Sequence, residues 1–593
     1  MQSSYVKEKW FIKNLKPKEK IDISKFNIDE VTLKLILNRG VSNEEEMREF
    51  LNPEISNLHS PILLPNLVKA GNILQNHLRE KNKIRIVGDY DVDGIMSSFI
   101  LTDSLRKLGA DVDFRIPLRV EEGYGINESI IEECLRDGIK LIITCDNGIA
   151  AFKPIELARE KFIDVIVTDH HEIPLDENNE EILVTANAII NPKLKSSTYP
   201  FKDICGACVA LKLCEYMWML SGKDLDDFYN VYLGPLSIAT ICDVMPLVKE
   251  NRIIVKNGLE RLEKWDNVGF KALVDILGIK FPFSNYHVGF IIGPTLNSSG
   301  RFEDAKMALN LLFEEQTDRA LEMAENLKNI NDQRKNKTEE AFKKGIAMVE
   351  SLDLLSKLSV LIIYLKDVHE SICGIVAGKI KELYNRPTIV LTNTDKGLKG
   401  SGRSIESYHM FEKISKSKGF LKSFGGHKMA CGLSLDEDLL KDFITDVQKK
   451  ADLTEDDLFR KILIDAKISF SDLNMDRVLN FKKLEPCGNE NPQALFGTIG
   501  ARVKGIQILG KNKNFIKIFL VENEKVMEAT LFEDGQAFVE KFSNIFSKEE
   551  VDKALKSVNN NIVLDICYSP VINEFMGKTS IQLKLKSYRK SGV

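Results

Sequence analysis

Long apolar runs are missing from this 593-residue sequence, in which no stretch of about 18 residues is apolar enough to cross a bilayer. Residues 1–10 also lack the apolar core of a secretory signal. These absences exclude a membrane-spanning or secreted protein from our expectations and favour a cytoplasmic location.

An excess of positive charge is missing too. The chain has 82 lysine and arginine residues against 87 aspartate and glutamate residues, a formal net charge of -5. Bulk charge therefore gives no argument for nucleic-acid binding, and any contact with DNA must come from local basic surfaces.

The 10 cysteines form no repeating framework, which is typical of a reducing compartment. Cys205 and Cys208 have the spacing of a zinc or redox motif. No second such pair and no nearby histidine pair completes a zinc site, and the segment is apolar. We therefore expect two buried core thiols.

The length of the chain indicates several domains, since single hydrophobic cores stop growing at about 250–300 residues. From about residue 60 to 260, buried strand patterns alternate with amphipathic helices such as 97–108 and 130–135. This alternation predicts an α/β domain around a mainly parallel sheet.

Acidic side chains follow three of these predicted strands. Strand 84–87 is followed by Asp89, Asp91 and Asp93, strand 141–144 by Asp146, and strand 164–168 by Asp169, His170 and His171. An Asp-rich turn that caps the next helix is the structural alternative for the first group. Because ligands collect at the carboxyl ends of strands in open α/β sheets, we expect the three groups to converge.

Carboxylates mixed with imidazoles suit Mn²⁺ or Mg²⁺, and two nearby metal ions suit phosphoester hydrolysis. The segments 89–94, 146–148 and 169–171, with Asp243 in 239–246, resemble in order and spacing the four motifs of the DHH phosphoesterases. The wider match covers nearly the whole chain and is similar to the single-strand-specific 5′-to-3′ DNA exonucleases of that superfamily. In that family residue 208 tends to be glycine, and Cys208 departs from the pattern.

The resemblance implies a metal-dependent exonuclease that releases nucleoside 5′-monophosphates in DNA repair and recombination. It implies one or two Mn²⁺ or Mg²⁺ ions and adds Asp243 to the ligands. The implied metal ligands are Asp89, Asp91, Asp93, Asp146, His170, His171 and Asp243, and Asp169 and His427 complete the implied catalytic set.

Two arginine segments accompany these motifs. Arg119 lies in the glycine-containing segment 116–125, where an arginine can pair with a phosphate or simply be solvated. Residues 293–301 predict a glycine-flanked polar loop before a helix, a cradle for an anion with Arg301 as a clamp, or else a helix N-cap. The resemblance implies that Arg119, Asn297 and Arg301 bind DNA phosphates.

A charged, regularly spaced segment from 314 to about 348 predicts a long exposed helix between two lobes. Two strands are predicted at 358–364 and 388–391, and two glycine-rich segments follow at 400–404 and 424–427. Each glycine-rich segment is either a tight turn or a phosphate-binding loop. These resemble the DHH-associated domain. The implied phosphate-binding residues are Ser401, Gly402, Arg403, Ser404, Gly425 and Gly426.

Short alternating segments after about residue 495 predict a small β-barrel. Basic residues along it, among them Lys504, Lys511 and Lys513, suit a groove for a single strand. We expect the neighbouring Phe515 and Phe519 to lie in the core. The resemblance implies an OB-fold.

The sequence therefore predicts an α/β protein in five parts, with no large extension after the barrel. They are an N-terminal lead-in (1–50) with a short helix at 29–37, a DHH-type parallel-sheet catalytic domain (51–315), a linking helix (316–350), a DHH-associated α/β domain (351–455), and a connector with a C-terminal OB-fold β-barrel (456–593). The resemblance implies a cleft between the lobes that admits one strand, single-stranded DNA as substrate, and a helicase and single-strand-binding protein as partners. We expect a monomer.

Two other functions remain open from the residues. A DHH-type hydrolase of short oligonucleotides, cyclic dinucleotides or pyrophosphate would use the same metal site, although it has no need of a basic barrel. A metal-free replication or repair scaffold would have lost its ligands, whereas every acidic and histidine position is filled here.

Overall fold

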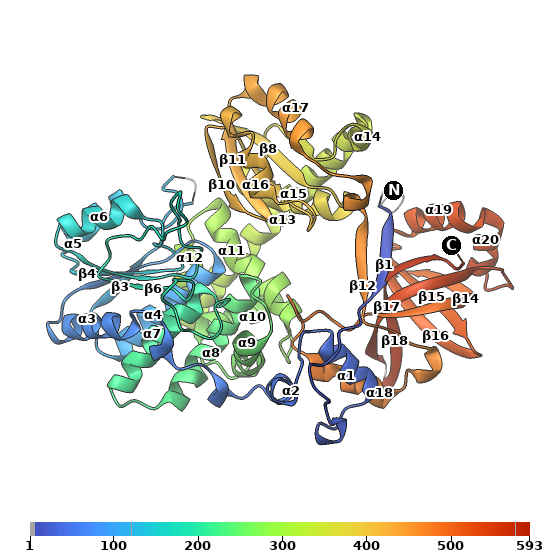
Figure 1. The fold of residues 1–593 in the computed structure, drawn as a ribbon, viewed down its shortest axis with the longest axis horizontal. Coiled ribbons are helices and arrows are strands. Elements are labelled where there is room, and N and C mark those ends of the chain that lie inside the picture. The colour runs from blue at the N-terminus through green and yellow to red at the C-terminus, as the bar shows by residue number, and fades with distance from the viewer. Residues whose placement is uncertain (1–5, 120, 576, 593) are drawn as a thin grey trace. The chain divides into compact units, whose positions relative to one another are not determined.

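The computed structural model describes residues 6–119, 121–575 and 577–592. It divides into two compact units (Figure 1): unit I comprises Glu45–Gln333 with Leu484–Pro492, and unit II the remaining residues. Residues 1–5 of the predicted lead-in, Val120 beside Arg119, and Met576 and Val593 of the predicted barrel lie outside the described residues.

Unit I is built on a five-stranded sheet in which every pairing is parallel. The strand order is β3-β2-β4-β5-β6, so the chain reverses direction across the sheet next to β2. The strands are β2 (Ile84–Val87), β3 (Val112–Arg115), β4 (Leu141–Cys145), β5 (Asp164–Thr168) and β6 (Ala188–Ile190). The predicted parallel sheet is confirmed.

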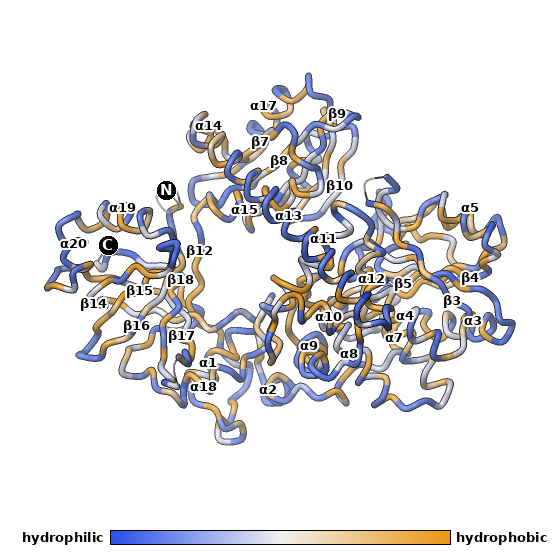
Figure 2. The backbone as a smooth tube through the Cα atoms, turned by 180° about the vertical axis from the view of Figure 1, so that it is seen from behind, coloured by the Kyte–Doolittle hydropathy of each residue, from blue (hydrophilic) through white to orange (hydrophobic). Residues whose placement is uncertain are grey.

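Helices cover both faces of this sheet, as Figure 1 shows. Helices α3 (Leu67–Arg79), α4 (Val92–Lys107) and α7 (Gly206–Leu220) pack on one face. Helices α5 (Glu128–Asp137) and α6 (Phe152–Glu160) pack on the other. Burial on both faces explains why Leu141–Ile143 of β4 and Val165–Val167 of β5 are apolar, and this stretch of the sheet is largely orange in Figure 2.

A helical layer completes unit I. It contains α8 (Leu225–Cys242), α9 (Lys249–Leu262), α10 (Val268–Leu277), the π-helix η4 (His287–Ile292), α11 (Gly293–Phe302) and α12 (Lys306–Leu312). The prediction of a loop at 293–301 is wrong, because these residues form α11. Its polar side chains bond to nearby backbone carbonyls: Thr295 Oγ1 donates to Ile291 O, in the preceding η4, at 2.7 Å, and Ser298 Oγ to Thr295 O, within the helix, at 2.6 Å.

Helix α13 (Thr317–Ser351) is continuous for 35 residues and passes from unit I into unit II. This confirms the long helix predicted between about residues 314 and 348. The short segment Leu484–Pro492 belongs to unit I, where buried Arg252 donates to the carbonyls of Leu484 and Glu485 at 2.9 Å each.

The first sheet of unit II has the order β10-β11-β9-β8-β7. Its strands are β7 (Leu361–Tyr364), β8 (Thr388–Thr394), β9 (Gly397–Arg403), β10 (Ser423–His427) and β11 (Ala430–Leu435). Helix α15 (Glu370–Tyr384) packs on β8 and β9, and α17 (Leu440–Lys450) contributes Phe443 and Val447 to the core. The predicted second α/β domain is therefore present.

The second sheet of unit II closes into a barrel, because β14 pairs with both β15 and β17 and the remaining strands link these two. The strands are β13 (Ala466–Lys467), β14 (Phe496–Leu509), β15 (Phe515–Glu522), β16 (Lys525–Phe532), β17 (Val563–Phe575) and β18 (Lys578–Lys590). The predicted barrel is confirmed.

The placement predicted for Phe515 and Phe519 is wrong. Ile516, Ile518 and Leu520 fill the barrel core, so the two phenylalanines point to the opposite, half-exposed face. Strand β15 is apolar at almost every position, and alternation alone could not decide which face is buried.

The N-terminal segment contains the predicted helix as α1 (Glu30–Leu37), with Asp29 as its N-cap. It also contains a strand that the sequence analysis missed, β1 (Glu8–Ile12), which pairs in parallel with β12 (Arg460–Ile464). The two strands lie about 450 residues apart, a separation across which no local pattern reveals a pairing.

No helix within the described ranges combines the length and the apolar character needed to cross a membrane.

Candidate metal centre

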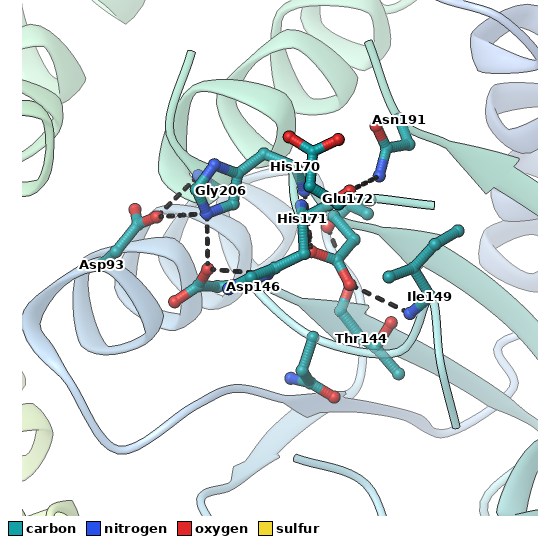
Figure 3. Close-up of polar contacts among 12 residues, drawn as sticks. Asp93, Thr144, Asp146, Ile149, His170, His171, Glu172, Asn191 and Gly206 are labelled. Carbon is teal, nitrogen blue, oxygen red and sulfur yellow. Dashed lines mark hydrogen bonds and ion pairs between the residues drawn. The ribbon is translucent and has the colours of Figure 1, made fainter. Parts of the chain in front are cut away.

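The three acidic groups meet at the carboxyl edge of the parallel sheet. The loop after β2 carries Asp89 and Asp91, and Asp93 follows in the first turn of α4. The end of β4 is followed by Asp146, and the end of β5 by Asp169–His171. Asp243 joins them as the C-cap of α8. Figure 3 shows Asp93, Asp146 and His170 pointing toward one another.

Three overlapping groups of side chains place their ligand atoms within 4.8 Å of one another. The groups are Asp146, His170 and His171; Asp93, His170 and Asp243; and Asp89, Asp91 and Asp146. His170 is central, with its Nε2 atom 3.1 Å from Asp146 Oδ1 and 3.7 Å from both Asp93 Oδ2 and Asp243 Oδ2. Because the groups share His170 and Asp146, the arrangement suits two adjoining cations.

The carboxylates need a cation to offset their repulsion. Asp89 Oδ1 and Asp243 Oδ2 are buried without a hydrogen-bond partner among the described residues. Burial, and then the charges of neighbouring aspartates, raises the pKa of Asp89, Asp146 and Asp243, and raises that of Asp93 to about 6. Oxygen atoms of this kind are the ligands that Mg²⁺ and Mn²⁺ prefer, so the residues fit such an ion.

Asp93 is held by the start of helix α7. Its carboxylate accepts hydrogen bonds from the backbone amides of Gly206 at 2.6 Å and Ala207 at 2.8 Å. These amides have no carbonyl partner within the helix, and a carboxylate at a helix N-terminus is favoured by the helix dipole. A methyl group at Gly206 would lie 2.7 Å from Cβ of Asp146, so only glycine fits there.

Asp169 orients the other ligands. It is fully buried and accepts hydrogen bonds from the amides of Ile149, His170 and His171 and from Nδ1 of His171 at 2.8 Å. Burial opposes ionisation, but the His171 hydrogen bond and the imidazole charges outweigh it and lower the pKa of Asp169 to about 2. Asp169 belongs to none of the three ligand groups found in the described chain.

The two histidines have opposite electrostatic environments. Burial and the neighbouring His171 lower the pKa of His170 to about 3, which leaves its ring neutral near pH 7 and able to bind a cation. Burial also opposes the charged form of His171, but its hydrogen bond to Asp169 raises its pKa to about 9.

Two further residues shape the site without having been assigned a role from the sequence. Asn147 donates to the carbonyls of Val87 and Cys145, both at 2.9 Å, and so ties the ends of β2 and β4 together. Tyr124 donates its hydroxyl to the carbonyl of Asp146 at 2.7 Å. Asn147 lies inside the 146–148 motif, so its position could have indicated a role. For Tyr124 the sequence offered only its place in the glycine-containing segment 116–125.

The predicted phosphate-binding residues of unit I lie beside this loop. The Arg119 guanidinium lies 4.7 Å from the centroid of the Tyr90 ring, and its charge favours the ionised form of Asp89. Asn297 and Arg301 are on the half-exposed side of α11. The same helix packs closely on the loop, since a methyl group at Gly300 would lie 2.5 Å from the Tyr90 carbonyl oxygen.

In unit II, three predicted residues share one face of the first sheet. Arg403 and His427 both pair with Ala430, and Ser401 pairs with Gly432, which in turn pairs with Gly425. Added methyl groups at Gly425 and Gly432 would meet no atom within 4 Å, so the surface between the polar side chains is flat and open. Burial and the Arg403 charge lower the pKa of His427.

The remaining predicted residues of this region point elsewhere. Ser404 is buried, and its hydroxyl donates to the Tyr408 carbonyl, so its side chain does not reach the open surface. Gly402 and Gly426 face the core side, where added methyl groups would approach Cys431. We therefore correct the expected side-chain contact of Ser404 with phosphate.

In the barrel, Lys504 is exposed on β14, and Lys511 and Lys513 lie in the turn between β14 and β15. In the chain, Lys511 and Lys513 come shortly before Phe515, whose ring centroid is 4.9 Å from that of Phe532, while Lys504 lies near the other end of the β14–β15 pairing. Lys517, on the same face as Phe515, pairs with Glu528 at 2.9 Å.

Cys205 and Cys208 are buried thiols, as the sequence predicts. Cys205 is the N-cap of α7 and Cys208 lies within that helix. Cys208 stands where the family tends to have glycine, yet the amides of Gly206 and Ala207 still donate to Asp93.

Three family models match successive segments of the chain. The model of the DHH family N-terminal domain matches residues 83–240, that of the DHHA1 domain matches 357–452, and that of the RecJ OB domain matches 464–587.

Two curated relatives are named single-stranded-DNA-specific exonuclease RecJ. The protein of Haemophilus influenzae is 31% identical over 564 residues, which cover 92% of this chain and 93% of the relative. The protein of Bacillus subtilis (strain 168) is 33% identical over 515 residues, covering 86% of this chain but 64% of the relative. The chain thus spans less than two thirds of that second relative.

A solved structure has the same fold. The crystal structure of RecJ in complex with Mn²⁺ from Thermus thermophilus has a TM-score of 0.82 and 24% sequence identity. The match covers 99% of this chain and 80% of that one.

Proposed function

The chain belongs to the RecJ family of single-stranded-DNA-specific exonucleases, and we propose that it hydrolyses single-stranded DNA from the 5′ end, releasing nucleoside 5′-monophosphates. The observation that carries this proposal is the convergence of carboxylates and imidazoles around His170. The chain also has a barrel with exposed lysines, which suits a long strand and which a small substrate does not need.

One or two Mn²⁺ or Mg²⁺ ions would be held by the residues of the three ligand groups. These are Asp89, Asp91, Asp93, Asp146, His170, His171 and Asp243. When bound, such ions lower the pKa of a coordinated water and stabilise negative charge on the scissile phosphate.

The protein residues supply position and charge. Asp169 fixes the His171 ring and both backbone amides that follow it, so the histidines meet the ion in one orientation. Arg119 and Arg301, whose charges both act on Tyr90, bind phosphates of the strand next to the scissile bond.

Selection of a 5′ end is the role we assign to Ser401 and Arg403, while His427, on the same face, stays assigned to the catalytic set. The flat surface between these side chains lets a phosphate approach the strands closely. The guanidinium of Arg403, oriented by a hydrogen bond from its Nη1 to the Gly402 carbonyl at 2.8 Å, supplies the positive charge. The exposed lysines Lys504, Lys511 and Lys513 bind the backbone of the strand along the barrel.

Such an enzyme acts in DNA repair and recombination in the cytoplasm. Its ten cysteines are all free thiols, which supports a reducing compartment. We further propose that it works as a monomer, beside a helicase that unwinds duplex DNA and a protein that coats single strands.

The decisive experiment is digestion of matched single-stranded and blunt duplex DNA, labelled at either end, with Mn²⁺ and with EDTA. We expect Mn²⁺-dependent release of mononucleotides from the 5′ end of single strands alone. Cleavage of dinucleotides or pyrophosphate with long DNA left intact would favour the small-substrate hydrolase. A folded protein that hydrolyses none of these would support a non-catalytic scaffold.

A further inference from the structure

Two stacked aromatic side chains lie exposed on unit I. Tyr286 is 63% exposed and Phe290 71%, and their ring centroids are 5.3 Å apart with an interplanar angle of 21°. Phe281, a few residues earlier in the chain, is also 57% exposed. Single exposed apolar residues need no explanation, whereas a pair of stacked rings in open solvent marks a binding surface.

The backbone beneath the rings is packed into the fold. Phe290 lies in η4, and the neighbouring Val288 and Ile292 are fully buried, so the backbone that carries the rings is packed into unit I. π-helical turns of this kind occur frequently at functional sites.

The helical segment formed by η4 and α11 contacts the two chain segments that carry Asp243 and Asp89–Asp91. Gly289 lies against Ile241, since an added methyl group would be 3.4 Å from its Cγ2 atom, and Ile241 is two residues before Asp243. At its other end, Gly300 packs on the carbonyl oxygen of Tyr90, between Asp89 and Asp91. The aromatic pair is therefore part of the wall that carries the metal ligands.

The exposed side of this segment continues into the phosphate-binding residues. From η4 into α11 the exposed or half-exposed positions include Tyr286, Phe290, Asn297 and Arg301, while Leu296 and Ser298–Gly300 are buried. One face of the segment thus presents two rings followed by an amide and a guanidinium.

We propose that Tyr286 and Phe290 are a stacking platform for bases of the single strand whose phosphates Asn297 and Arg301 bind. This deepens the proposed function and rests on it. Aromatic rings stack on any base and so bind without sequence preference. In a duplex each base is already stacked on its neighbours and has no free face for an aromatic ring. The platform therefore favours single strands.

The test is steady-state hydrolysis by the full-length protein with Mn²⁺, using single strands that carry one abasic site at successive positions. For the wild type we expect KM to rise roughly tenfold when the abasic site meets the platform. Tyr286→Ala and Phe290→Ala should raise KM for intact strands by a similar factor, with little change in kcat. In these alanine variants KM should no longer depend on the position of the abasic site. In Tyr286→Phe and Phe290→Trp, which keep an aromatic ring, that dependence of KM should return.

Phe162→Ala is the matched control, because Phe162 is 91% exposed and lies before the amino end of β5, at the edge of the sheet opposite the metal ligands. It should leave KM unchanged. Alanine variants with the KM and abasic profile of the wild type would overturn the platform while leaving the exonuclease proposal intact. A wild type that hydrolyses no single strand would instead contradict the proposed function itself.

Discussion

The carboxylate of Asp93 lies 2.6 Å from the backbone amide of Gly206, although the two residues are 113 positions apart in the chain. Asp93 therefore belongs to the fold as well as to the ligand set: it caps helix α7 while facing His170 at 3.7 Å. Asp243 has no such second role, because its buried Oδ2 has no hydrogen-bond partner in the described parts of the chain. The two ligands should respond differently to mutation.

Asp93→Ala should abolish hydrolysis and also destabilise the protein. It leaves two buried amide donors without an acceptor, and each such donor costs about 1–3 kcal/mol. Asp243→Asn should abolish hydrolysis just as fully, yet leave the melting temperature in EDTA unchanged or higher, because it removes one of several repelling carboxylates. Thermal unfolding of both variants in EDTA, paired with a nuclease assay, measures the difference. Turnover by a correctly folded Asp243→Asn protein would contradict its assignment as a ligand.

Removal of the metal should make stability depend on pH in a defined direction. The pKa of Asp93 in the folded protein is about 6, above its ordinary value of 3.8, so between these values the folded state holds the extra proton. Without a cation, this group's contribution to stability falls as pH rises from about 4 to 6. Mn²⁺ replaces the proton and binds only the folded state, so the rise in melting temperature that it causes should grow across that window. It should go on growing at higher pH, because His171, with a pKa of about 9, must also lose its proton to bind the ion.

The measurement is a series of thermal unfolding curves from pH 4.5 to 7.5, each with EDTA and with excess Mn²⁺. The Asp243→Asn variant provides a second series in which the Mn²⁺ effect should be much smaller at every pH. An Mn²⁺ effect that is constant or that shrinks as pH rises would contradict the role of these carboxylates.

Local patterns predicted the metal centre because its ligands follow strands whose apolar character is unmistakable. Asp89–Asp93, Asp146 and Asp169–His171 each come directly after such a strand, and parallel strands bring their carboxyl ends to one edge. The amides of Gly206 and Ala207 could not be predicted, since nothing near them in the sequence refers to Asp93. The pairing of β1 with β12 was out of reach for the same reason.

Ambiguous patterns explain two of the wrong predictions. Residues 293–301 contain glycine, proline and serine, which favour a loop locally, but tertiary packing on Tyr90 and hydrogen bonds within the helix select α11. In β15 both alternating sets of side chains are largely apolar, so either could have formed the core. In the closed barrel the isoleucines Ile516 and Ile518 pack inside, so Phe515 and Phe519 lie on the other face.

Gly300→Ala should damage the metal centre through packing. The added methyl group would lie 2.5 Å from the Tyr90 carbonyl oxygen, so the loop that carries Asp89 and Asp91 must move. Overpacking of this kind costs about 1–3 kcal/mol, and we expect at least a tenfold loss of kcat. Gly289→Ala is the control in the same helical segment, because its methyl group would meet only Ile241, at an ordinary 3.4 Å. Equal activity of the two variants would show that the contact with Tyr90 does not set the loop.

Arg403→Ala should weaken the preference for a 5′-phosphate over a 5′-hydroxyl end by roughly tenfold or more, since a hydrogen bond to a charged group contributes about 1.5–3 kcal/mol. Ser404→Ala, one residue further, should lower the melting temperature because its buried hydroxyl donates to the Tyr408 carbonyl, yet leave the end preference unchanged. Competition between the two kinds of strand, digested together with Mn²⁺, measures the preference directly. An Arg403→Ala protein that slows on both ends by the same factor would assign Arg403 to general DNA binding, because a residue that recognises the terminal phosphate cannot affect a strand that lacks it.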